Sequence, residues 1–110
     1  MRMIEKPWGF ELIWAETENY VGKLLHINVK QRLSLQYHDQ KEETVYVTQG
    51  TLLNYTDIDG PPQHIPAGQS FHVSPNQVHR FGAGKTYVEL IEVSTPHLED
   101  VVRLADDYDR

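Results

Sequence analysis

The feature that most constrains this sequence is a series of short runs in which apolar and polar side chains alternate. Leu25, Ile27 and Val29, for example, alternate with His26 and Asn28, and a period of two places each set on one face of a β-strand. Runs of this kind, rich in strand-forming residues, occupy 23–29, 33–38, 44–48, 52–55, 69–73 and 87–93. Clusters of Gly, Pro, Asn and Asp separate them and favour tight turns. The spacing predicts an all-β sandwich or small barrel.

Helical periodicity is confined to one segment near the end of the sequence. Leu98, Val101, Val102 and Ala105 would share one face of a helix. We therefore expect a single short helix or turn over residues 98–105.

Length and composition limit the class of protein. The 110 residues favour one domain spanning residues 1–110. The 10 Lys and Arg residues are scattered among 16 Asp and Glu, and the formal charge of −6 argues against binding to nucleic acid or to an anionic membrane surface. The absence of Cys excludes a disulfide framework, a Cys-ligated zinc site and a thiol nucleophile. No apolar stretch resembles a membrane helix or a signal peptide, so we expect a cytoplasmic protein.

Side chains able to bind a metal ion are concentrated in two segments. Gln36 and His38 are two residues apart in a predicted strand, so they project from the same face, and Glu43 follows shortly after. His79 comes just after the tight turn predicted at Ser74-Pro75-Asn76. Imidazole, carboxylate and amide donors together suit first-row divalent metals without selecting one of them.

These residues resemble the two sequence motifs of the cupins. Gln36, His38, Glu43 and Gly50 match the spacing of the first motif, in which cupins have His-x-His followed by Glu and Gly. The second motif is matched by Gly68 and His79. Four positions depart from the usual cupin residues Gly, Pro, Gly and Asn, and they hold Lys30, Ser74, Asn76 and Ala83.

The sequence is most similar to one branch of the cupins, the domain of type II phosphomannose isomerases that also ends many GDP-mannose pyrophosphorylases. The stretch Leu-Ser-Leu-Gln-x-His over residues 33–38, followed by Lys41 and Glu43, resembles that domain, as do Lys6–Phe10 and the segment 92–110. One difference directly follows the ligand Glu, where the family has His-Trp and this sequence has Thr44-Val45.

The resemblance implies a small cupin, an antiparallel jelly-roll barrel that forms a homodimer. An N-terminal strand is expected to pair with the second subunit, with Trp8 and Trp14 as packing or interface anchors. The resemblance also implies a site for a divalent ion (zinc, or manganese, iron, nickel or cobalt) with open positions for substrate, its ligands being Gln36, His38, Glu43 and His79.

The implied activity is metal-dependent isomerisation of a sugar or sugar phosphate, as in mannose-6-phosphate isomerase. Lys41 and Arg80 adjoin ligand positions and are expected to contact phosphate or hydroxyl groups, with Lys23 and Arg103 as secondary candidates. His26 or His72 is expected to move the proton if it faces into the barrel. Two alternatives stay open: an Fe(II)-dependent cupin dioxygenase or other oxidoreductase, and a non-catalytic carbohydrate-binding or regulatory cupin.

Overall fold

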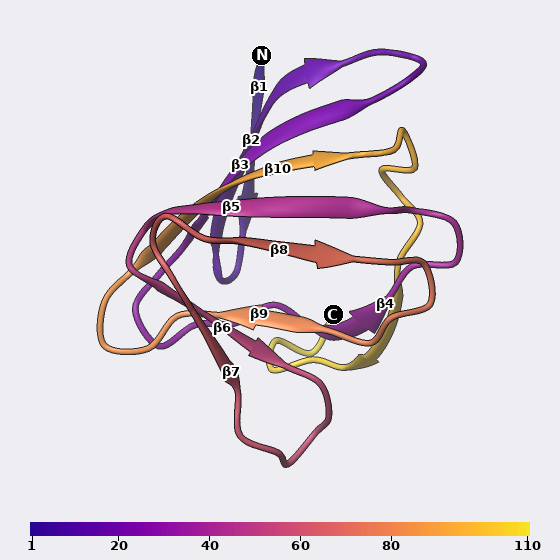
Figure 1. Cartoon of the computed structure of the whole chain (residues 1–110). Helices are drawn as coiled ribbons and strands as arrows, with labels where there is room; N and C mark the ends of the chain where they lie inside the picture. Colours follow the sequence, from indigo (N-terminus) through magenta and orange to yellow (C-terminus); the bar gives the residue numbers. More distant parts are fainter.

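The computed structural model describes residues 1–110 and consists of eleven β-strands joined by turns and loops (Figure 1). No helix in it could cross a membrane. Every pair of neighbouring strands is antiparallel, which confirms the all-β prediction. The strands are β1 (Arg2–Lys6), β2 (Gly9–Glu16), β3 (Val21–Ile27), β4 (Leu35–Tyr37), β5 (Glu43–Gln49), β6 (Thr51–Tyr55), β7 (Gln63–Pro66), β8 (Ser70–Val73), β9 (Arg80–Gly82), β10 (Val88–Ser94) and β11 (Val102–Ala105).

The strands form three sheets that together enclose the core. The largest has six strands in the order β1-β2-β3-β10-β5-β8, and β7-β6-β9 and β11-β4 form the smaller ones. Figure 1 shows β10, β5 and β8 running side by side across the molecule, with β6 and β9 below them. Because β10 lies between β3 and β5, strands far apart in the sequence are neighbours in space. This is the antiparallel jelly-roll arrangement that the resemblance implied.

The alternation of side chains decides what enters the core. Val45 and Val47 of β5 and Leu90 of β10 point inward and are fully buried, whereas Tyr46 of β5 points outward and is about half exposed. Trp8, in the turn between β1 and β2, is buried against this core as a packing residue. The buried cluster comprises Trp8, Leu25, Ile27, Val45, Val47, Leu52, Ile65, Val73, Phe81, Ala83, Val88 and Leu90.

Of the short helix or turn predicted over residues 98–105, the helix is wrong and only a turn at residues 98–99 is present. Residues Val102–Ala105 form β11, in which Val102 lies opposite Tyr37 and Arg103 opposite Gln36 of β4. An eight-residue helix is marginal in water because its nucleation is costly. The edge of β4 instead supplies backbone hydrogen-bond partners. The segment therefore lies as a strand along the barrel.

The N-terminal strand β1 and two short internal strands, β7 and β9, add detail that the alternation did not predict. The N-terminal strand exists, but β1 forms a hairpin with β2 inside this chain, with Met3 opposite Leu12. The strands β7 and β9 have only four and three residues, and β7 ends in a proline. Runs this short carry little periodic signal.

The C-terminal segment is fastened to the barrel by one carboxylate. Asp107 accepts hydrogen bonds from Arg32 Nε at 2.7 Å and from Arg80 Nη2 at 3.1 Å. The Tyr108 hydroxyl adds a bond to the Gln31 side chain at 2.7 Å. The hydrogen bond from Arg32 lowers the pKa of Asp107 most, partial burial opposes this, and the charges of Arg32 and Arg80 lower it further.

We predict that Asp107→Asn destabilises the protein in a pH-dependent way. A carboxyl group whose pKa is lower in the folded state than in the unfolded state stabilises the fold at pH values above its ordinary pKa, which is 3.8 for Asp107. That contribution is lost as the pH falls through the lowered folded-state value. Urea unfolding should give the variant a lower free energy of unfolding than the wild type at neutral pH. This difference should shrink as the pH falls below about 3.8. Asp59→Asn, at an exposed loop carboxylate without an ion pair, is the control. A difference that stays constant with pH would contradict this role.

Candidate metal centre

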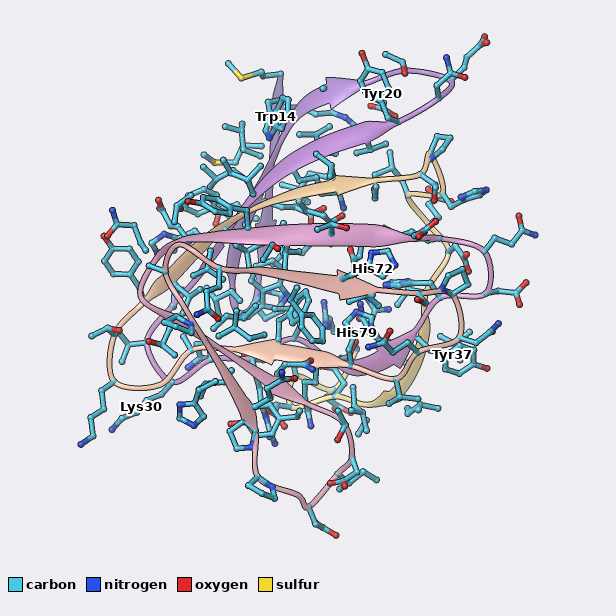
Figure 2. The ribbon with its side chains drawn as sticks, viewed as in Figure 1. Trp14, Tyr20, Lys30, Tyr37, His72 and His79 are labelled. Carbon is cyan, nitrogen blue, oxygen red and sulfur yellow. The ribbon has the colours of Figure 1, made fainter.

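Three buried side chains from separate parts of the sequence converge inside the barrel. His38 follows β4, Glu43 begins β5 and His79 directly precedes β9, and Figure 2 shows His79 between β8 and β9. Their ligand atoms all lie within 4.8 Å of one another. Oε1 of Glu43 is 3.2 Å from His79 Nε2 and 3.5 Å from His38 Nε2. The convergence of these three predicted ligands gives the chain one candidate metal site.

Backbone hydrogen bonds bring the two histidines together. Gln36 and His79 exchange a pair of N–H···O bonds, each 2.9 Å long, and the amide of Asn76 donates to the carbonyl of His38 at 2.6 Å. Asn76 has φ of 65°, a left-handed conformation that Asn tolerates better than most residues. The turn preceding His79 therefore holds that residue and His38 in register.

The hydrogen bonds of the two rings leave both inner nitrogens without a partner. His38 Nδ1 contacts the Asp100 carbonyl at 2.5 Å, and His79 Nδ1 contacts the Gln77 carbonyl at 3.1 Å. Since a carbonyl only accepts, each Nδ1 carries the proton and each Nε2 of the neutral ring presents a lone pair. Both Nε2 atoms are buried and lack a hydrogen-bond partner, and both face the Glu43 carboxylate. Lone pairs directed at an anion suit a cation placed among them, so the site fits a divalent metal ion.

Lys41 occupies the second oxygen of Glu43. Its Nζ is 3.2 Å from Glu43 Oε2 and 3.1 Å from Glu92 Oε2, which leaves Glu43 Oε1 facing the histidines. Burial opposes ionisation of Glu43 most strongly, but the charge of Lys41 helps to hold its pKa well below the ordinary value. Burial also opposes charge on Lys41, yet Glu92 and Glu43 raise its pKa. The ion pair thus keeps Glu43 available as a ligand.

A second buried carboxylate, Glu92, lies beside this pair. Burial and then repulsion from Glu43 raise the pKa of Glu92 to about 7, despite the opposing charges of Lys41 and Lys23. Lys23 is itself 3.5 Å from Glu11. All these groups line one cavity with the three candidate ligands.

Gln36 also lines this cavity. Its side-chain oxygen accepts a 2.6 Å hydrogen bond from the Ser34 hydroxyl. Its role as a fourth metal ligand stays a prediction.

Of the four residues predicted first to act on substrate, only Lys41 lies in the cavity, and the secondary candidates Lys23 and Arg103 also line it. Arg80 points to the opposite side of β9 from His79, and its Nε donates to the Leu33 carbonyl at 2.8 Å. It is buried beneath the C-terminal segment, where it binds Asp107. A residue next to an inward-pointing ligand points outward in a strand, which is why adjacency in the sequence was misleading here.

His26 and His72 both lie on the outside of the large sheet. His26 stacks between Phe10 and Tyr87 and is 2.7 Å from a carboxylate oxygen of Glu89. His72 is exposed on β8, with Nε2 3.0 Å from Glu42 (Figure 2). The condition that one of them faces into the barrel is not met.

From the sequence, a substrate contact was predicted for only one of the three cations at the cavity mouth, and for that one only as a secondary candidate. Lys6, Arg103 and Arg110 line the mouth, and neither Lys6 nor Arg103 makes an ion pair within the chain. Lys6 belongs to the Lys-Pro-Trp-Gly stretch that carried part of the resemblance. That stretch is the sequence feature from which a role for Lys6 in the site could have been predicted. The cavity volume is about 100 Å³, so a ligand larger than its inner space would extend among these cations.

We predict that the protein purified without added metal contains about one divalent ion per chain, a stoichiometry that follows from its one cluster of ligands. His38→Ala and His79→Ala should each lose the ion because each removes one inward-facing imidazole. Elemental mass spectrometry provides the measurement, and His72→Ala is the matched control on the outer surface. Retention of the ion in both inner variants would contradict this assignment, as would a wild-type protein that takes up no ion on reconstitution.

Asp100 holds His38 in place from outside the ligand set. Its carboxylate accepts hydrogen bonds from the amides of Asp39, Gln40 and Lys41 at 3.0, 2.6 and 2.9 Å. Its own carbonyl is the partner of His38 Nδ1. The hydrogen bonds from Gln40 and Asp39 lower the pKa of Asp100 to about 2, so the carboxylate stays ionised and keeps this contact.

We predict that Asp100→Ala weakens metal binding by about 10-fold to 100-fold, because the carbonyl that orients His38 is no longer fixed. Titration with a competing chelator measures the affinity directly. Glu99→Ala, at the exposed neighbouring carboxylate, should bind metal as the wild type does. Equal affinity in the wild type and Asp100→Ala would show that the contact does not position the ligand.

Comparison with known proteins agrees with this geometry. Residues 23–94 match the family described as the cupin domain. The chain is 33% identical over 114 residues to the mannose-1-phosphate guanylyltransferase of Escherichia coli strain K12, an alignment that covers 99% of this chain and 23% of that protein. The chain thus spans about a quarter of the length of this relative.

Solved structures share the fold at low sequence identity. The polyketide cyclase RemF from Streptomyces resistomycificus has a TM-score of 0.81, with 13% identity over 99% of this chain and 80% of its own. A sugar phosphate isomerase of the cupin superfamily from Silicibacter pomeroyi has a TM-score of 0.66, with 20% identity over 78% of this chain and 58% of its own. With its barrel, its two matched motifs and its His-Glu-His cluster, the chain belongs to the cupin domain family.

Proposed function

We propose that this protein is a metal-dependent isomerase that interconverts the aldose and ketose forms of a sugar phosphate, with mannose 6-phosphate as the first substrate to test. One observation carries the proposal: a buried His-Glu-His cluster shares a small cavity with Lys41 and Glu92, and cations line its mouth. The mannose-1-phosphate guanylyltransferase and the sugar phosphate isomerase described above support this substrate class.

The inner part of the cavity has the groups that the reaction requires. His38, Glu43 and His79 would hold a divalent ion, which when bound supplies a Lewis acid for a substrate carbonyl. Isomerisation also moves a proton between adjacent carbons. Glu92 lies in the cavity with Oε2 in an ion pair with Lys41, and a pKa raised to about 7 allows its carboxylate to accept this proton and return it. Lys41, 3.1 Å from that oxygen, orients Glu92.

The mouth of the cavity suits the phosphate group. Lys6 and Arg103 are free of ion pairs in the chain, while Arg110 is held by Asp106 at 2.8 Å. A volume of about 100 Å³ is small beside the roughly 300–1,000 Å³ of ligand pockets. The reacting carbons fit inside, and the phosphate at the far end of the sugar would lie among the cations. These residues replace Arg80 in the predicted phosphate contact.

We predict that the ion-loaded protein interconverts mannose 6-phosphate and fructose 6-phosphate under nitrogen. Glu92→Gln should lower kcat strongly while substrate binding is retained, because only the proton acceptor is removed. Lys6→Ala should raise KM by about 10-fold, the expected loss of one charge-assisted hydrogen bond. Lys85→Ala, at an exposed lysine away from the cavity, is the control. A coupled enzymatic assay follows the ketose product.

Other outcomes separate the alternatives. Oxygen consumption with the iron-loaded protein, and no isomerisation under nitrogen, would replace the proposal with a dioxygenase. Tight binding of sugar phosphates without turnover would indicate a carbohydrate-binding cupin. A kcat in Glu92→Gln equal to that of the wild type would remove Glu92 from the proton transfer but leave the isomerase activity in place.

A further inference from the structure

Two oppositely charged side chains of the cavity have no part in the proposed reaction. Glu11 of β2 and Lys23 of β3 both line the cavity. Their side chains are only 12% and 7% exposed, and Glu11 Oε1 is 3.5 Å from Lys23 Nζ. Replacing a buried ion pair with apolar side chains of similar size is often neutral or stabilising. Stability alone therefore does not account for two charges in the wall of a ligand cavity.

The order of the strands places this pair between the two ends of the cavity. In the large sheet the strands β1, β2, β3, β10 and β5 follow one another (Figure 1). They carry, in the same order, the cavity residues Lys6, Glu11, Lys23, Glu92 and Glu43. Lys6 belongs to the mouth and Glu43 is a candidate metal ligand. A ligand that reaches from the candidate metal centre to the mouth along this sheet therefore passes Glu11 and Lys23.

The pair leaves hydrogen-bonding capacity unused. An ammonium group has three donors, and a carboxylate has about four acceptor sites. The 3.5 Å contact is longer than the roughly 2.7–2.9 Å of a charge-assisted hydrogen bond. It is also the one ion pair that either residue makes in the chain. Lys23 therefore has donors, and Glu11 has acceptors, that are available to a ligand in the cavity.

A hydroxyl group is the ligand that satisfies both side chains at once. It accepts a hydrogen bond from Lys23 and donates one to Glu11. A phosphate or carboxylate group would be attracted by Lys23 but repelled by Glu11, and an amine would meet the reverse situation. Glu11 thus keeps Lys23 from serving as a phosphate site, in contrast to Lys6 and Arg103 at the mouth.

We propose that Glu11, acting with Lys23, forms a subsite that selects substrates with an uncharged hydroxyl on carbon 3 or carbon 4. This inference rests on the proposed function, in which carbons 1 and 2 react at the candidate metal centre and the phosphate lies at the mouth. No role for Glu11 was predicted from the sequence. The subsite makes Glu11 a specificity-determining residue, and it assigns Lys23 to a hydroxyl and not to the phosphate.

The test measures binding without turnover. Mannitol 6-phosphate has no carbonyl group to isomerise, and its 3-deoxy and 4-deoxy analogues each lack one of the two hydroxyls. Isothermal titration calorimetry compares these ligands and inorganic phosphate on the zinc-loaded protein. The variants are Glu11→Leu and the double variant Glu11→Leu/Lys23→Met, which leaves neither charge unpaired. Glu16→Leu, at an exposed carboxylate of the same strand, is the matched control, and circular dichroism checks that each variant is folded.

We expect the wild type and Glu16→Leu to bind mannitol 6-phosphate about 10-fold to 100-fold more tightly than one of the deoxy analogues, the expected effect of losing a hydroxyl bound to charged groups. The double variant should bind all three ligands equally, and its affinity for inorganic phosphate should match that of the wild type because Lys6 and Arg103 remain. Glu11→Leu should bind inorganic phosphate more tightly, since Lys23 is freed.

Three results would overturn the subsite alone: a wild type that binds all three ligands equally, a folded double variant that still discriminates, or a folded Glu11→Leu variant with no gain in phosphate affinity. Isomerase activity in the same preparation would show that the proposed function survives such a result. A wild type that binds none of the sugar ligands would overturn both the subsite and the proposed substrate class. If Glu11→Leu does not fold, the double variant decides.

Discussion

Two imidazole lone pairs directed at one buried carboxylate are the constraint around which this barrel is built. Each unpaired buried polar atom costs about 1–3 kcal/mol, and His38 Nε2 and His79 Nε2 are two such atoms in close contact with Glu43. Lys41, 3.2 Å away, pairs with the other oxygen of this carboxylate. A divalent cation beside Oε1 would give the two unpaired nitrogens a partner.

The C-terminal segment connects this centre to the rest of the fold. The Asp100 carbonyl fixes the ring of His38, and a few residues later Asp107 binds Arg32 and Arg80. Arg80 therefore fastens the segment that covers the barrel, although it directly follows the candidate ligand His79. Residues of this segment also line the cavity mouth, so the same stretch of chain orients a ligand and shapes the entrance.

The convergence of His38, Glu43 and His79 was predictable because their spacing sets which strand or turn each occupies. The backbone preserves that pattern even where the sequence departs from it. Lys30 and Asn76 stand where cupins have Gly, and both have positive φ, 61° and 65°. The orientation of Arg80, His26 and His72 was not predictable from proximity, since an offset of one residue reverses the face of a strand. The segment 98–105 was predicted wrongly because the edge of β4, which is distant in sequence, determined its structure.

The strict alternation in the central strands has a genetic consequence. In β3 and β5 the inward positions are odd-numbered, from Lys23 to Leu25 and from Glu43 to Val47, and in β10 they are even-numbered, as in Leu90 and Glu92. Neighbouring codons thus encode two surfaces with unrelated requirements. A substitution scan across these strands would separate by parity into two phenotypic classes, and the two surfaces can change independently in evolution although they share every hydrogen bond of the same backbone.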